Sequence, residues 1–270
     1  MRVSAQLLVP RSITTGIVAM LVCAMGLQAA EDRIPATGGD IVVRPLAHSS
    51  VQIEFGGRVI QVDPWSRANL ASAKPADLIL VTDADAGAHH LDVKGIEQIR
   101  KAGAPVVIPE SGKAKVPDGT VLANGQHREI AGFSIDVIAS YDVTPGDPFH
   151  AKGVANGYLI TLGGKRVFLA GVTECVPEIK ALRNVDVAFI PMNLPNGRMT
   201  PTAVADCLRT IKPKIAYPYH FDQAYIGRLS GRGGQPAATA AETVRTLADA
   251  VKNDGIDVRL GDWYQMPPGQ

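Results

Sequence analysis

The sequence has almost no excess of charge of either sign. It has 27 Lys and Arg residues and 26 Asp and Glu residues among 270 positions, which gives a formal net charge of +1. The basic residues are scattered, so neither a nucleic-acid surface nor a polybasic membrane patch is expected. No internal repeat of the solenoid type is present. These exclusions favour a globular protein: the chain has 46% hydrophobic residues and is long enough to bury a large core.

Several common catalytic signatures are also missing. No Gly-x-Ser-x-Gly nucleophile elbow occurs in the sequence. The stretch 231–234 (Gly-Arg-Gly-Gly) lacks the strand-to-helix frame and the Lys-Ser/Thr ending of a phosphate-binding loop, and indicates a flexible loop. A cysteine nucleophile is not favoured at Cys175, because the sequence fixes no histidine beside it.

A hydrophobic run lies at the N-terminus, where Arg2 and Arg11 precede the apolar stretch 13–30. With its Gln-Ala-Ala end and the polar sequence that follows, this pattern predicts a signal peptide over residues 1–30, cut near Ala30. An uncleaved transmembrane anchor is the alternative, because the stretch is near the short limit for spanning a bilayer. The small-residue end favours cleavage. We therefore expect an exported protein, periplasmic or secreted, without stable membrane anchoring.

Cysteine is scarce. Cys23 lies inside the predicted signal peptide, so the mature chain would hold only Cys175 and Cys207. Export permits a disulfide bond between them, but two cysteines in a domain of this size do not require one. Two free buried thiols are an equally good interpretation. The sequence leaves both open.

Short apolar strands alternate with helical segments from residue 41 onward, behind a leader segment 31–40 that contains Pro and Gly. Strands that alternate with helices indicate an α/β protein, and two strand-rich halves with helices outside predict a four-layer αββα sandwich in a single domain, 41–270. The expected strands are 41–44, 51–55, 59–62, 78–81, 106–108, 133–139, 157–162, 167–170, 185–190, 215–217 and 258–260, and the expected helices are 93–102, 177–182, 200–211 and 237–253.

The segment 78–92 carries the densest group of candidate metal ligands. An apolar strand ends at Thr82, and a loop of acids and imidazoles follows it. A strand end that delivers such side chains into one loop is a common way to build a zinc site. The loop residues are Asp83, Asp85, His89, His90 and Asp92, of which Asp92 is expected to cap the following helix.

The frame Thr82-Asp83 with His90-Leu91-Asp92 resembles the metallo-β-lactamase superfamily, whose motif here is His-x-His-x-Asp-His, with Asp first in one branch. The branch is that of the ascorbate-phosphate lactonase-like hydrolases. The resemblance covers almost the whole mature chain, about 41–264, and implies the αββα fold and a metallo-hydrolase ancestry. The segments that carry it are 45–48, 62–65, 149–158, 171–174, 191–200, 218–220 and 261–264.

Carried over residue by residue, the resemblance implies a set of ligands and also departures from the family pattern. The implied metal ligands are Asp83, His90, His150 and His220. The loop is two residues longer than the motif and lacks its second His and its Asp, and Val172 stands where the metal-bridging Asp would be. Because two divalent ions need an anionic bridge, we expect at most one metal ion, zinc, or none.

Five other side chains are candidates for the pocket or for the layer behind the ligands. Asp63 either orients an imidazole or caps its own turn. His48 lines the pocket or, as the better interpretation, is a hydrogen-bonded structural histidine. Glu174 is a general base or a surface acid. His89 and Lys152 complete the set, with Lys152 suited to holding an anion.

The sequence therefore predicts an exported hydrolase-family protein with a degraded metal site. At most it would use one zinc ion to hydrolyse an ester, a lactone or a phosphoester. The alternative is a non-catalytic protein that binds a small anionic ligand in the same pocket through His150, Lys152 and His220. Either way the expected partner is a small molecule.

Overall fold

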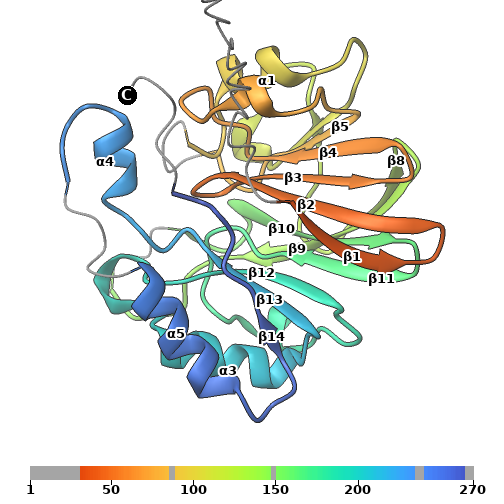
Figure 1. Cartoon of the computed structure of the whole chain (residues 1–270). Coiled ribbons are helices and arrows are strands. Elements are labelled where there is room, and N and C mark those ends of the chain that lie inside the picture. Colours follow the sequence, from red (N-terminus) through yellow and green to blue (C-terminus); the bar gives the residue numbers. More distant parts are fainter. Residues whose placement is uncertain (1–30, 85–88, 147–149, 235–239, 265–270) are drawn as a thin grey trace, which may run out of the picture.

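The computed structural model describes residues 31–84, 89–146, 150–234 and 240–264. Two seven-stranded sheets pack face to face, and helices cover their outer faces (Figure 1). This is the four-layer αββα sandwich that the sequence predicts, and the prediction is confirmed. The proposed signal peptide 1–30 and Asp85 lie outside the described residues.

The first sheet follows the order of the chain, β1 to β7. Its first four strands pair antiparallel, and β4 to β7 pair parallel. The turn at 56–57 joins β3 to β4 as a hairpin, with Phe55 opposite Arg58. The strands are β1 (Asp32–Ala36), β2 (Gly39–Ala47), β3 (Ser50–Phe55), β4 (Arg58–Val62), β5 (Leu78–Leu80), β6 (Val106–Ile108) and β7 (Thr120–Val121).

The second sheet repeats this plan, with β8 to β11 antiparallel and β11 to β14 parallel. Since the carboxyl ends of parallel strands meet at one edge of a sheet, each half of the molecule directs several loops to that edge. The strands are β8 (His127–Ile130), β9 (Phe133–Ser140), β10 (Ala155–Leu162), β11 (Lys165–Leu169), β12 (Val187–Pro191), β13 (Ile215–Tyr219) and β14 (Asp257–Val258).

Helix α1 covers the first sheet, and α3 and α5 cover the second (Figure 1). Asp92 accepts from the backbone N–H of Lys94 and caps α1, and Thr200 caps α3 in the same way. Within the described residues, none of the helices has the length and apolar character needed to cross a membrane. The helices are α1 (Val93–Ile99), α2 (Pro177–Lys180), α3 (Pro201–Ile211), α4 (Tyr225–Leu229) and α5 (Ala240–Val251), with 3₁₀ turns at Leu70–Ser72, Glu110–Gly112 and Pro195–Gly197.

The main core lies between the two sheets. Val51 and Ile53 of β3 are fully buried, as is Ile135 of β9, and these side chains belong to one apolar cluster. Side chains alternate between the two faces of a strand, so each strand contributes every second residue to this layer. A second cluster, which includes Ile96 and Ile99, packs α1 onto the outer face of the first sheet.

The segment 31–40 differs from the expected leader, because it contains β1 and the start of β2, with Asp32 paired to Val43. Pro35 suggested a leader, yet β1 is an edge strand, and an edge is where a sheet accepts proline. Asp32 also bonds the hydroxyl of Tyr217 and the guanidinium of Arg259, which ties the edge strand to the second sheet.

Element ends also differ from the expected ones. The helix expected over 93–102 ends at Ile99, ahead of a glycine turn at Gly103 (φ 75°). The helix expected over 237–253 is described from Ala240 to Val251. The short helix α4 was not predicted, because five residues that include Gly227 show no helical period.

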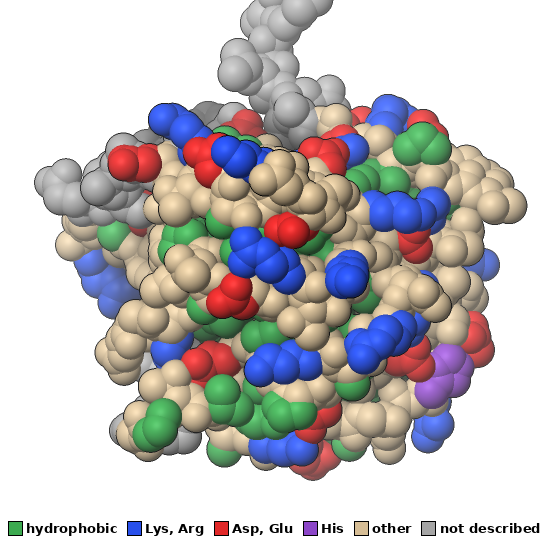
Figure 2. Space-filling model, turned by 90° about the horizontal axis from the view of Figure 1, so that it is seen from below, with side chains coloured by type: hydrophobic (Ala, Val, Ile, Leu, Met, Phe, Trp, Pro, Cys, Tyr) green, Lys and Arg blue, Asp and Glu red, His purple; other side chains and the backbone are tan. Residues whose placement is uncertain are grey.

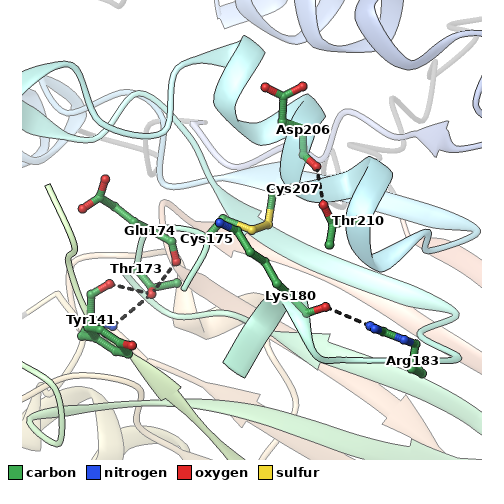
Figure 3. The surroundings of a disulfide bond; sticks show 9 residues. All are labelled: Tyr141, Thr173, Glu174, Cys175, Lys180, Arg183, Asp206, Cys207 and Thr210. Atoms are coloured by element: carbon green, nitrogen blue, oxygen red, sulfur yellow. Dashed lines mark hydrogen bonds between the residues drawn. A yellow bond between two sulfur atoms is a disulfide. The ribbon is translucent and has the colours of Figure 1, made fainter. Parts of the chain in front are cut away.

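Cys175 and Cys207 form a disulfide bond, which decides between the two interpretations left open by the sequence (Figure 3). Their Cα atoms are 5.8 Å apart. The bond ties the loop after β11 to helix α3. In the same loop the side chain of Thr173 hydrogen-bonds the backbone of Tyr141.

Basic and acidic side chains are intermixed on the face seen from below in Figure 2. Arg209 of α3, for example, is ion-paired with Asp206 and with Asp254. Such exposed pairs are worth little to stability, about 0.2–1 kcal/mol each.

Candidate metal centre

Four histidines converge at the edge where the loops after β2, β5 and β13 meet. His48 follows β2, His89 and His90 follow β5, and His220 follows β13. The backbone N–H of His220 donates to the carbonyl of His48 (3.1 Å), which joins the two sheets at this point. Both residues have left-handed backbone, with φ of 53° and 55°. Such conformations cost energy in non-glycine residues and cluster at functional sites.

The four rings form one compact group, here called the imidazole cluster (His48, His89, His90 and His220). His90 Nε2 and His220 Nε2 are 3.3 Å apart, and the rings of His48 and His220 lie 3.9 Å apart. One ring nitrogen from each of His48, His89 and His220 lies within 4.8 Å of the others. Four imidazoles from three loops thus direct nitrogen atoms into one small space.

His48 is not the hydrogen-bonded structural histidine that the sequence favoured. Its side chain is fully buried, yet neither ring nitrogen has a hydrogen-bond partner among the described residues. Leaving such groups unpaired costs about 1–3 kcal/mol, so a fold keeps them only where something else uses them. The lone pair of this imidazole is available to a bound group.

Asp63, directly after β4, fixes the orientation of His90. His90 Nδ1 donates to Asp63 Oδ2 (2.7 Å), and Thr82 donates to the same carboxyl group through its backbone N–H (2.7 Å) and its hydroxyl (2.6 Å). The hydrogen bond at Nδ1 turns Nε2 of His90 toward His220. Carboxylates behind metal-bound imidazoles act in this way. Of the two roles considered for Asp63, the geometry matches the orienting one.

Burial keeps most of the cluster uncharged. Desolvation, helped by the neighbouring imidazoles, lowers the pKa of His48 and of His220 well below the usual value. The same causes lower the pKa of His89 to about 3. A neutral imidazole has the free lone pair that a metal ion requires, so these rings are in the metal-binding form at neutral pH.

The stability of the metal-free protein should therefore fall between pH 7 and pH 5. The folded-state pKa values of His48, His89 and His220 lie below the unfolded value of about 6.5. Their contribution is complete above that pH and is lost as pH falls, by up to about 1.4 kcal/mol per pH unit for each imidazole. Thermal unfolding in chelator at pH 7, 6 and 5 measures this. A midpoint that holds steady or rises toward pH 5 would contradict it, and His48→Gln should flatten the slope.

The imidazole cluster fits one metal ion. Two nitrogens bound to the same tetrahedral zinc, each about 2.0–2.1 Å from it, lie about 3.3 Å from one another. His90 Nε2 and His220 Nε2 have that separation, 3.3 Å. Imidazole donors suit zinc, copper, iron and nickel ions. The unpaired buried nitrogens of His48 provide a further donor beside this pair.

Asp83 and His150, two of the implied ligands, are bonded to one another. His150 Nε2 lies 2.8 Å from Asp83 Oδ2, and His150 Nδ1 lies 3.6 Å from Asp142 Oδ2. Asp142 is in turn ion-paired with Arg198. Burial lowers the pKa of His150, but its bonds to Asp142 and Asp83 raise it to about 9. Asp142 and Arg198 were not predicted, because neither belongs to a recognisable ligand motif and they meet only in the folded chain.

The remaining candidates lie apart from the cluster. Lys152 is exposed and paired with Glu178 (2.5 Å). Glu174 accepts from the backbone N–H groups of Val143 and Thr144 (2.6 Å each), so it fastens one loop to another. Val172 is buried in the main core, where it offers no carboxylate.

The β-lactamase superfamily domain is the family whose model matches this sequence, over residues 43–220. The match begins in β2 and ends at His220, so it spans all four histidines. The chain belongs to the metallo-β-lactamase superfamily.

Proteins similar to this chain include several named as metal-dependent hydrolases. A UPF0173 metal-dependent hydrolase of Pyrococcus abyssi is 30% identical over 201 residues, which are 67% of this chain and 85% of the relative. One of Symbiobacterium thermophilum is 29% identical over 197 residues, 66% and 83% of the two chains. A crystal structure from Parabacteroides distasonis, provisionally named a metal-dependent hydrolase, is 33% identical with a TM-score of 0.74, and covers 87% of this chain and 99% of that one.

Proposed function

We propose that this chain is an exported hydrolase that depends on a single metal ion held in the imidazole cluster. The observation that carries the proposal is the convergence of four imidazoles, three buried and that of His89 half-buried, with a 3.3 Å contact between His90 Nε2 and His220 Nε2. Asp63 supports it by holding His90 in the orientation that metal sites use. The names of the relatives agree with a metal-dependent hydrolase.

A catalytic zinc site keeps three protein ligands and one open position, so three imidazoles of the cluster would bind the metal and the fourth would lie beside it. When bound, a metal ion supplies a water whose pKa falls from about 15.7 toward 7, and polarises a substrate carbonyl or phosphoryl group. The chain itself orients His90 through Asp63 and surrounds the cluster with buried side chains such as Trp65 and Tyr225. Esters, lactones and phosphoesters are the substrate classes that this chemistry serves.

The non-catalytic alternative, a pocket for a small anionic ligand, loses two of its three proposed contacts. Lys152 is paired with Glu178 at the surface. His150 lies between Asp83 and Asp142, and carboxylates repel an anion. His220 remains, inside the imidazole cluster. These contacts favour the metal-dependent hydrolase.

Metal analysis of the mature protein, purified without added zinc, tests the proposal. We expect one equivalent of divalent metal per chain after dialysis, and hydrolysis within a panel of ester, lactone and phosphodiester substrates that chelator abolishes. One equivalent is expected because Val172 supplies no bridging carboxylate. Two equivalents in one pocket would contradict the single-metal site. Absence of both metal and turnover would favour the binding protein.

Export is the second part of the proposal. The charged start, the apolar run and the small-residue end of residues 1–30 support it, and so does the Cys175–Cys207 disulfide, because disulfides persist in oxidising compartments. We expect mass spectrometry of the secreted or periplasmic protein to find a mature N-terminus near Glu31. An intact Met1 in the soluble fraction would contradict cleavage.

A further inference from the structure

A chain of four charged side chains lies beside the imidazole cluster, and the hydrolytic proposal does not use it. It runs from Asp83 through His150 and Asp142 to Arg198, and is called here the ionic chain. Asp83 follows β5, Asp142 follows β9, His150 precedes β10, and Arg198 follows the turn Pro195–Gly197. All four side chains are at most 5% exposed. Four loops thus enclose a buried network that reaches the metal centre at Asp83.

We propose that this ionic chain fills the half of the site that a second metal ion would need, so that His150 is not a metal ligand. The inference rests on the proposed function, in that it takes the imidazole cluster as the place of the one metal ion. It assigns His150 a positioning role, that of fixing Asp83 beside the centre.

Distances between side-chain atoms show which pairs are hydrogen-bonded and which have the spacing of two ligands on one metal ion. His150 Nε2 is 2.8 Å from Asp83 Oδ2, the length of a charge-assisted hydrogen bond. Two atoms bound to one tetrahedral zinc lie about 3.3 Å apart, as the nitrogens of His90 and His220 do. A nitrogen that donates a proton to Asp83 has no lone pair for a metal. The atom that His150 would offer is therefore already used.

The opposite side of His150 is closed by a second carboxylate. Asp142 Oδ2 accepts from the backbone N–H of His150 (3.0 Å) and lies 3.6 Å from its Nδ1. The backbone N–H of Asp142 donates back to the carbonyl of His150 (3.0 Å). This reciprocal pair of backbone hydrogen bonds holds His150 between two acids. Its Nε2 is bonded to Asp83, and its Nδ1, which has no hydrogen-bond partner among the described residues, is buried 3.6 Å from Asp142.

The charges of the ionic chain oppose a second divalent ion. Arg198 brings a guanidinium group into the protein, where it is paired with Asp142. Asp83 has His150 as its partner. A metal ion placed here would lie near a fixed guanidinium, and repulsion between like charges is strong away from water. Val172, in the main core, adds no carboxylate to compensate.

The ionic chain also gives the centre a fixed acid. Asp83 and His150 lie close enough to His89 for each to change its pKa, Asp83 upward and His150 downward. Anchoring Asp83 through His150 therefore fixes one carboxyl group close to the imidazole cluster.

Metal titration of three variants tests the inference. His150→Gln keeps a donor for Asp83, His220→Ala removes a cluster nitrogen, and His127→Gln is the matched control on exposed strand β8. We expect one equivalent of zinc in wild type, His127→Gln and His150→Gln. The zinc affinity of His150→Gln should fall by no more than 10–100-fold, the loss typical when a residue behind the metal ligands is replaced. Its cobalt-loaded visible spectrum should match that of wild type. A changed spectrum, or loss of one equivalent in His150→Gln, would overturn the inference.

Nitrogen-15 spectra of the wild-type imidazoles give an answer that does not depend on the variants folding. We expect His150 Nε2 to carry its proton both in chelator and after zinc is added. Loss of that proton on zinc addition would show that His150 is a ligand and would contradict the proposal. A wild-type chain that binds no metal would defeat the proposed function, while the His150 signal in the same sample would still decide the Asp83–His150 bond.

Discussion

His220→Ala is expected to lower zinc affinity by more than about 100-fold, beyond the 10–100-fold that removal of an outer partner costs, and to abolish hydrolysis. His220 has the closest contacts of the imidazole cluster, 3.3 Å to His90 Nε2 and a 3.9 Å ring separation from His48. Its loss removes one of the two nitrogens that have the 3.3 Å separation expected on one zinc ion, and His48 and His90 are held by their own loops, so they cannot restore that pair. Equilibrium titration with zinc and a competing chelator measures the affinity.

The matched control is His127→Ala, which removes an exposed histidine on β8 that bonds Asp136. It should bind one equivalent with unchanged affinity. The metal-free His220→Ala protein should keep the circular dichroism of the metal-free wild type, since the lost imidazole is desolvated and its ring nitrogens make only long contacts, 3.3 Å to His90 and 3.4 Å to Gln223. Tight binding of one equivalent by His220→Ala would place the metal elsewhere and remove the main support for the proposed function.

The frame of the fold could be predicted because its signals are local. The run 78–81 is apolar, two glycines at 56–57 join two strands, and Asp92 stands before an apolar helix. Each feature acts within a few residues, so sequence alone shows it. The edge strand β1 escaped prediction because Pro35 is unfavourable in most strands and acceptable only at an edge, and no local pattern tells which strand will be the edge.

The partners of the site residues could not be predicted, because they depend on contacts between distant loops. His150 meets Asp83 across 67 positions of sequence, and His90 meets His220 across 130. The family resemblance places these residues near one site but does not decide whether Asp83 and His150 bind a metal or one another. For His48, the absence of a hydrogen-bond partner follows from its enclosure among other rings, which a sequence motif does not contain.

Removing the Cys175–Cys207 disulfide is expected to lower the free energy of unfolding by about 3–4 kcal/mol, since it closes a chain segment with a sequence separation of 32. In a domain of this size that corresponds to roughly 10 °C in the unfolding midpoint. The measurement is denaturant unfolding of the double variant Cys175→Ala/Cys207→Ala beside oxidised wild type. Wild type that has been fully reduced should match the variant, because both lack the cross-link.

Removing the disulfide should lower stability without changing metal binding. The disulfide joins α3 to the loop that carries Thr173 and Glu174 (Figure 3). These two residues fasten the segment 141–144, while the four cluster histidines lie on other loops. The double variant should therefore keep one equivalent of metal at a temperature where it is folded, whereas His220→Ala loses metal and stays folded. A loss of less than about 1 kcal/mol on reduction would mean that the cross-link contributes little. A loss of metal in the double variant would show that the Glu174 loop supports the centre directly.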